Sequence, residues 1–317
     1  MRTELVGHYL LFLLMISLTG CWVQPPEGRF TVRVTDTDGS PISGAQIMAT
    51  DLHDTVRGTT DKDGNCLIRV LTPKGGVDLS VDHNGYYPIY RLIYEFKSHQ
   101  NGRYLPWDNT VELRLHKIGR SVPMFVRKIH LAIPELDRAI GFDLLVSDWV
   151  RPYGHGTNSD FSFLAERWMR EDNRIAGRLK ISFPNSGDGL FRVRVPYRNS
   201  YGLKLPALAP IGGYQGPWEL RLRSEMDSDP SRVTADLNFD QDVNYFFRVR
   251  SRRQSEGGPE EGVYGKIYDG ISFRVWEART NVVIQFLYYL NPDGTRNTEW
   301  DTRSNLCSNP GDISLRP

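Results

Sequence analysis

Histidine and cysteine, the residues on which many enzyme signatures depend, are scarce in this chain. Only seven of the 317 residues are histidine and only three are cysteine. No histidine has a glutamate three positions later, as zinc peptidases with an HxxE motif require. The GxSxG motif of serine hydrolases and the phosphate-binding P-loop are also missing. We therefore expect no metal site and no cofactor, and we expect that the chain is not an enzyme.

A cell-surface hydrolase remains the alternative, because the paired carboxylates of glycosidases leave no short sequence signature. Such a pair can be hidden among the 38 acidic residues. Residues 119–317 are long enough to hold an active site of this kind for a glycoside or a peptide substrate.

An excess of one charge and long hydrophobic runs are lacking too. The 39 basic and 38 acidic residues leave a net charge of +1, so nothing in the charge favours a nucleic-acid partner. The apolar run at residues 9–18 is too short to span a bilayer as a permanent helix. A hydrophobic content of 39% nevertheless indicates a folded, globular protein.

The short apolar run ends in the sequence LTGC, residues 18–21. This sequence resembles the lipobox of bacterial lipoprotein precursors, in which two small residues separate a branched apolar residue from a cysteine. The resemblance implies that residues 1–20 are a signal peptide and that the Cys21 thiol carries a diacylglycerol. Acyl chains contribute about 0.8 kcal/mol per buried methylene, so the lipid bilayer is the implied partner. The alternative is an ordinary secretory signal with a chance cysteine.

The lipobox places the protein in the bacterial cell envelope, with residues 21–28 as a tether. Trp22 stands where an aspartate would often signal retention at the inner membrane, so we expect the outer membrane. In these oxidising surroundings Cys66 and Cys307 are candidates for a disulfide. The alternative is that Cys66 is a small buried hydrophobe and Cys307 a free thiol in the tail. The sequence does not decide between the two.

Residues 29–118 are expected to form an antiparallel β-sandwich. Phe30, Val32 and Val34 alternate with polar residues, which is the period of a half-buried strand. The same alternation recurs in short stretches up to residues 111–115, and glycine and proline separate them. No helical stretch interrupts this pattern, so a sandwich is favoured over a mixed fold.

Three motifs of this region are similar to those of the carboxypeptidase regulatory-like domain, which has a transthyretin-like sandwich. They are the hairpin DTDGSPISGA, the TDKDG turn before a strand, and the Gly-Tyr pair after a strand in VDHNGYYP. The resemblance covers residues 29–118. It implies the fold of an accessory module of secreted proteins and says little about function.

The segment TDKDGNC, residues 60–66, also matches the start of a calcium-binding EF-hand loop. Asp61, Asp63 and Asn65 have the alternate spacing of such ligands. The twelfth position, where a bidentate glutamate is required, is Thr72. Because Asp and Gly are also the residues that a tight turn needs, we expect a turn here.

Residues 119–317 are again strand-like and predict a second antiparallel domain, a sandwich or jelly roll. The two domains give an all-β chain with two β-sandwiches in tandem. Only the segment SFLAERWMRED, residues 162–172, is ambiguous between helix and strand.

The candidate ligand-binding segment is SDWVRPYGHGTNSDF, residues 147–161. Trp149 and Tyr153 can offer flat faces to a sugar ring, while Asp148, His155 and Asp160 can supply hydrogen bonds. The partner would be a glycan or another envelope protein. The alternative is that Trp149 fills the core and the glycines only turn the chain.

A weaker cluster of polar residues precedes a later strand. It consists of Asp240, Asp242 and Asn244. These side chains can hold a cation, although an acidic loop explains them more simply.

Overall fold

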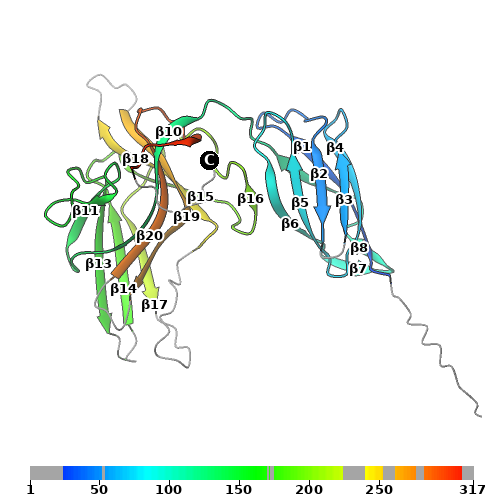
Figure 1. Cartoon of the computed structure of the whole chain (residues 1–317). Helices are drawn as coiled ribbons and strands as arrows, with labels where there is room; N and C mark the ends of the chain where they lie inside the picture. Colours follow the sequence, from blue (N-terminus) through cyan, green and yellow to red (C-terminus); the bar gives the residue numbers. More distant parts are fainter. Residues whose placement is uncertain are drawn as a thin grey trace, which may run out of the picture.

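The computed structural model describes residues 24–51, 54–169, 171, 175–223, 240–252, 261–275 and 282–308. Cys21 and the expected signal peptide lie outside these residues. The described residues contain no helix with the length and hydropathy that a membrane span requires. The expected fold class is confirmed: the chain is all-β, with two sandwiches in tandem (Figure 1).

The first sandwich consists of two packed sheets. One sheet has the order β4-β1-β8-β7, with β9 also paired to β1, and the other contains β6-β5-β2-β3. The strands are β1 (Glu27–Thr35), β2 (Gln46–Thr50), β3 (Thr55–Thr59), β4 (Asn65–Leu71), β5 (Gly76–Asp82), β6 (Ile89–Glu95), β7 (Ser98–Gln100), β8 (Arg103–Leu105) and β9 (Asn109–Arg114). Strand β1 therefore begins within the segment expected to be a tether.

Alternation of apolar and polar residues builds the core of this sandwich, as expected. Phe30, Val32 and Val34 of β1 are fully buried, and Ile47 and Leu79 meet them from the second sheet. Most of the pairing is antiparallel, but β1 and β9 run parallel. The outward residues of these strands remain in water, so each sheet buries one face only.

The TDKDGN segment forms a turn. The Asp61 carboxylate accepts hydrogen bonds from the backbone N–H groups of Asp63 and Asn65, both at 2.9 Å. Gly64 has a φ of +77°, which only glycine adopts without strain. One carboxylate oxygen of Asp61, Oδ1, thus closes the turn before β4.

The second sandwich packs a six-stranded sheet, β15-β18-β19-β20-β10-β21, on a smaller one, β12-β11-β13-β14-β17. Its strands are β10 (Val122–Ala132), β11 (Ala139–Asp143), β12 (Asp148–Trp149), β13 (Phe161–Met169), β14 (Ile175–Ser182), β15 (Gly189–Arg194), β17 (Trp218–Arg223), β18 (Val243–Arg252), β19 (Glu261–Val275), β20 (Val282–Asn291) and β21 (Trp300–Asn305). The ambiguous segment is largely strand β13, because Phe161, Phe163 and Ala165 point into the core.

The six-stranded sheet is covered on both faces. Phe247 and Phe286 face the smaller sheet in the main core. On the opposite face, Phe246 and Tyr289 pack against Leu205, which belongs to the segment between β15 and β17. This cover explains why residues 243–249 of β18 are buried without interruption.

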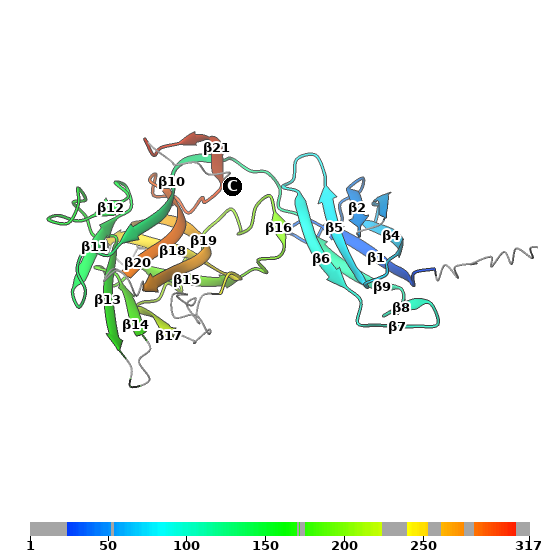
Figure 2. The same ribbon diagram turned by 60° about the horizontal axis from the view of Figure 1, so that its bottom comes forward.

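A short strand of the second domain completes a sheet of the first. Strand β16 (Ser200–Tyr201) pairs with the edge strand β6, and Figures 1 and 2 both show it between the sandwiches. The backbone N–H of Gly202 donates to the carbonyl of Pro88 at 2.7 Å. The Tyr201 ring packs on the first core. Edge pairing therefore joins the two domains.

The candidate disulfide is not formed, since Cys66 and Cys307 are both free thiols. Cys66 is 7% exposed and points into the first sandwich, where its sulfur lies against Gly58. Cys307 follows β21 in the second domain, and its backbone N–H donates to Asn305. Burial raises the pKa of both thiols. Cys66 is thus the small buried hydrophobe of the alternative interpretation.

Candidate functional site

The structure divides the five residues expected to bind a ligand into surface and core groups. Trp149 is 4% exposed, and its indole N–H donates to the carbonyl of Ala132 at 3.1 Å. Its ring packs edge-on against Phe142 and Phe163. Trp149 is therefore a core residue and offers no face to a sugar.

Asp148 belongs to β12, and Tyr153 and His155 lie on the loop that follows this strand. The Asp148 carboxylate accepts hydrogen bonds from the His155 backbone and from Nδ1 of its ring, both at 2.9 Å. Burial opposes ionisation of Asp148, but these hydrogen bonds outweigh it and lower the pKa. The His155 side chain is 89% exposed, and the Tyr153 hydroxyl donates to Glu135. The structure thus brings Asp148 and His155 together at the surface.

Asp160 belongs to a buried charge cluster beneath this loop. Arg250 donates to Asp160 at 2.7 Å and to Asp143 at 2.9 Å, and each carboxylate is 1% exposed. Burial raises the pKa of Asp160, and Arg250 partly offsets this effect. Arg250 has a φ of +57° at an irregularity of β18. The cluster ties β18 to the smaller sheet.

Asp240 and Asp242 form an acidic loop before β18, as the simpler interpretation held, and Asn244 lies within that strand. Arg194 contacts Asp240 at 2.6 Å and Asp242 at 3.6 Å. Asn244 is fully buried, and its side chain bonds the carbonyl of Asp242 and the backbone N–H of Asp269. These groups already satisfy one another.

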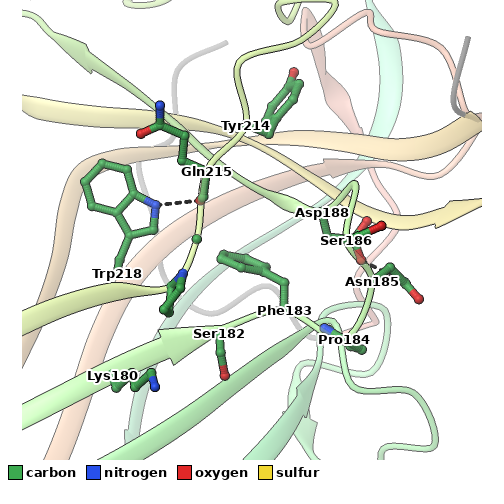
Figure 3. Close-up of a pocket in the computed structure, with 12 residues that line it drawn as sticks. Lys180, Ser182, Phe183, Pro184, Asn185, Ser186, Asp188, Tyr214, Gln215 and Trp218 are labelled. Carbon is green, nitrogen blue, oxygen red and sulfur yellow. Dashed lines mark hydrogen bonds between the residues drawn. The ribbon is translucent and has the colours of Figure 1, made fainter.

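A groove of about 880 Å³ opens at one end of the second sandwich. One wall is the loop from the end of β14 to β15, and the other is the segment that leads into β17 (Figure 3). Its volume lies within the range typical of small-molecule sites. We therefore regard this groove as the candidate functional site.

Three aromatic side chains give the groove flat apolar surfaces. They are Phe183, Tyr214 and Trp218, all partly exposed. The Trp218 indole N–H donates to the carbonyl of Gln215 at 2.7 Å, which fixes the ring (Figure 3). Phe183 lies against Gly216, so close that a Cβ there would approach its ring to 2.6 Å.

Hydrogen bonds hold the two walls in place. Leu190 and Gln215 exchange two backbone hydrogen bonds of 2.9 Å. Asp188 is 5% exposed and accepts hydrogen bonds from Asn185 and from the backbone N–H of Ser251. The groove is thus built on ordered backbone, which a preformed binding site requires.

Polar groups beside the aromatic rings can contact a ligand. Ser182, Ser186 and Gln215 line the groove, and Lys180 stands at one end. Aromatic surfaces next to hydroxyl and amide groups suit a ligand that has both apolar and hydroxylated faces.

In the sequence, both walls have only the character of loops. The stretches PNSGDG and APIGGYQGP contain the Gly and Pro residues of ordinary turns. The available signal was the aromatic residues beside these turns: Phe183 precedes the first, Tyr214 lies in the second and Trp218 follows it. Only the fold shows that the two loops face each other.

Comparison with solved structures finds distant likenesses. A 3-chlorocatechol 1,2-dioxygenase from Rhodococcus opacus 1CP has a TM-score of 0.24 and 12% identity, over 30% of this chain and 61% of that one. A shaft pilin from Lactobacillus rhamnosus GG has a TM-score of 0.21 and 8% identity, over 74% of this chain and 90% of that one. A putative carbohydrate binding protein from Bacteroides uniformis ATCC 8492 has a TM-score of 0.20 and 9% identity, over 83% of this chain and 98% of that one.

This chain spans less than two thirds of the dioxygenase chain. At such scores these likenesses carry no argument about function. No protein with a curated function matches the chain. The first sandwich does have a recognisable family: residues 29–104 match the carboxypeptidase regulatory-like domain, which confirms the resemblance found in its turn motifs.

Proposed function

We propose that this protein is a lipid-anchored lipoprotein of the bacterial envelope that binds carbohydrate without acting on it. The observation that carries the proposal is the groove of the second sandwich, with Trp218 and Phe183 beside hydrogen-bonding side chains. Sugar rings have C–H faces that pack on aromatic rings and hydroxyl groups that need hydrogen bonds. The first sandwich is an accessory module that holds the groove away from the membrane.

A non-catalytic role is supported by the state of the buried carboxylate pair. A glycosidase needs two carboxyl groups that reach the substrate, one as an acid and the other as a base or nucleophile. Asp143 and Asp160 are each 1% exposed and share Arg250. They stabilise the fold and have no free face for a substrate.

The test of carbohydrate binding is a glycan array probed with the soluble chain, residues 22–317, and with its Trp218→Ala variant. We expect binding to one class of glycan and a loss of roughly three- to tenfold in the variant, since stacking contributes about 0.5–1.5 kcal/mol. Trp168→Ala is the matched control, because Trp168 is 46% exposed on β13 and outside the groove. Equal binding by the two variants would contradict the proposal.

The anchor is tested separately. Mass spectrometry of the mature N-terminus should find a chain that begins at an acylated Cys21, and Cys21→Ser should move the protein from the outer-membrane fraction to the soluble fraction. The lipobox LTGC is the observation that motivates this part. Recovery of an uncleaved, unacylated chain would contradict it.

A further inference from the structure

The groove has a second compartment on the other side of Trp218. A pocket of about 280 Å³ is lined by Trp218 and by residues of β15, β18 and β19, among them Arg192 and Tyr245. The Trp218 ring packs on Tyr245 at a centroid distance of 5.7 Å. Because Trp218 lines both hollows, they adjoin across its ring.

The acidic side chains of both compartments already have partners. Asp188 bonds to Ser251 and to the backbone of Arg250. Glu219 pairs with Arg221 at 2.7 Å. Arg221 offsets the charge of Glu219, while Asp188, whose partners are neutral groups, is 5% exposed and keeps its negative charge within the wall.

Asp240, in the smaller compartment, is paired in the same way. Its carboxylate contacts Arg194 at 2.6 Å. A hydrogen bond from the backbone N–H of Asp242 lowers the pKa of Asp240, and the hydrogen bond and charge of Arg194 lower it further. Arg192 contributes only through its charge. Within the described part of the chain, the Arg192 guanidinium forms no hydrogen bond and no ion pair.

Each compartment presents one cation without an ion pair. Lys180 lines the larger compartment and Arg192 the smaller, and both side chains are exposed. Among the described residues, neither forms a salt bridge. A ligand that lies across Trp218 would meet one unpaired cation on each side.

We propose that the two compartments form one site for an acidic oligosaccharide, a chain of sugar units that carries carboxylate groups. The inference rests on the proposed carbohydrate-binding function and specifies its ligand class. One sugar unit stacks on Trp218, while carboxylates of units on either side contact Lys180 and Arg192. Arginine suits a planar carboxylate because it can donate two parallel hydrogen bonds.

The test is isothermal titration of the soluble chain with uronate oligomers of one to six units. The probes are oligogalacturonates, alginate oligomers and glucuronate-containing oligomers, each compared with neutral oligosaccharides of the same length. We expect an acidic series to bind, with affinity that rises beyond the monomer and falls with added salt. Lys180→Gln and Arg192→Gln should each weaken binding roughly three- to tenfold.

Lys97→Gln and Arg151→Gln are matched controls, since both residues are exposed and outside the two compartments. If neutral oligomers bind, and neither Lys180→Gln nor Arg192→Gln changes their affinity, the acidic ligand class is wrong. The proposed carbohydrate-binding function would still stand. Binding of the monomer as tightly as the hexamer would overturn the two-compartment site alone. Absence of binding by every probe would overturn both.

Discussion

The hydroxyl group of Tyr87, in the first sandwich, donates a hydrogen bond of 2.6 Å to the carboxylate of Glu299 in the second. Glu299 is 2% exposed and also accepts a hydrogen bond of 2.9 Å from the backbone N–H of Gly119, between the domains. This carboxylate therefore connects both sandwiches and their linker. It acts beside the β16–β6 pairing, so two separate contacts hold the domains together.

Tyr87→Phe should loosen this junction. The variant leaves the buried Glu299 carboxylate with one hydrogen bond fewer, and hydrogen bonds to charged groups contribute about 1.5–3 kcal/mol. We expect faster hydrogen exchange at the backbone amides of Gly119 and Gly202, whose bonds cross the junction. Tyr197→Phe is the control, because Tyr197 is 49% exposed. Unchanged exchange at both amides would show that the Tyr87 hydroxyl does not hold the domains.

Lys266→Met should stabilise the second sandwich. Lys266 is fully buried, and its ammonium nitrogen has no hydrogen-bond partner among the described residues. The rings of Tyr268 and Tyr289 lie 4.9 Å from that nitrogen. Desolvation lowers the pKa of Lys266 to about 7, and Glu299 only partly opposes this shift. A buried donor without a partner costs about 1–3 kcal/mol, and an apolar side chain of similar size removes this cost.

The gain from Lys266→Met should depend on pH. Between about pH 7 and the ordinary lysine pKa of 10.5, the folded state binds fewer protons than the unfolded state. The free energy of unfolding of the parent chain therefore falls as the pH drops through this window. Urea denaturation should show a large gain at pH 7 that shrinks toward pH 10. Lys128→Met, at an exposed position of β10, should show no such trend; the same trend in both variants would refute the assignment to Lys266.

The first sandwich could be predicted from its sequence for a physical reason. Each of its sheets buries one face, so Phe30, Val32 and Val34 alternate visibly with exposed residues. Its turns need Asp and Gly at fixed positions, and Asp61 and Gly64 perform that task. Local sequence and tertiary structure therefore agree along this domain.

The second sandwich was predictable only in its class. Lys266 is fully buried because the segment around Leu205 covers that face of the sheet. For Trp149 the sequence allowed a surface loop and favoured the core. Its burial depends on Phe142 and Phe163, which other strands supply. Contacts between distant segments decide such positions, and periodicity within one strand carries no information about them.

Arg250→Met should destabilise the second sandwich strongly. Arg250 is the cation shared by Asp143 and Asp160, and its loss leaves two buried carboxylates with backbone hydrogen bonds but without a counter-charge. Removal of one partner of a buried ion pair costs about 3–5 kcal/mol. The loss in the free energy of unfolding, measured by urea denaturation, should shrink as the pH falls, because protonation removes the negative charges of the two buried carboxylates.

Asp160→Asn in the Arg250→Met background should recover part of the lost stability by removing one of the two negative charges. Arg303→Met is the control, because the Arg303 side chain is 88% exposed in its contact with Asp301. A loss in Arg250→Met no larger than that in Arg303→Met would mean that the cluster does not stabilise the fold.

Gly189→Ala should disrupt the binding groove while the first sandwich stays intact. A Cβ at Gly189 would lie 2.7 Å from the backbone nitrogen and oxygen of Gln215, closer than real side chains approach backbone atoms. The wall that carries Gln215 and Trp218 must then move, and overpacking of this kind costs about 1–3 kcal/mol. We expect loss of glycan binding together with lower thermal stability. Gly212→Ala in the same wall meets nothing within 4 Å and should change neither property; equal glycan binding by both variants would show that the ligand does not occupy this groove.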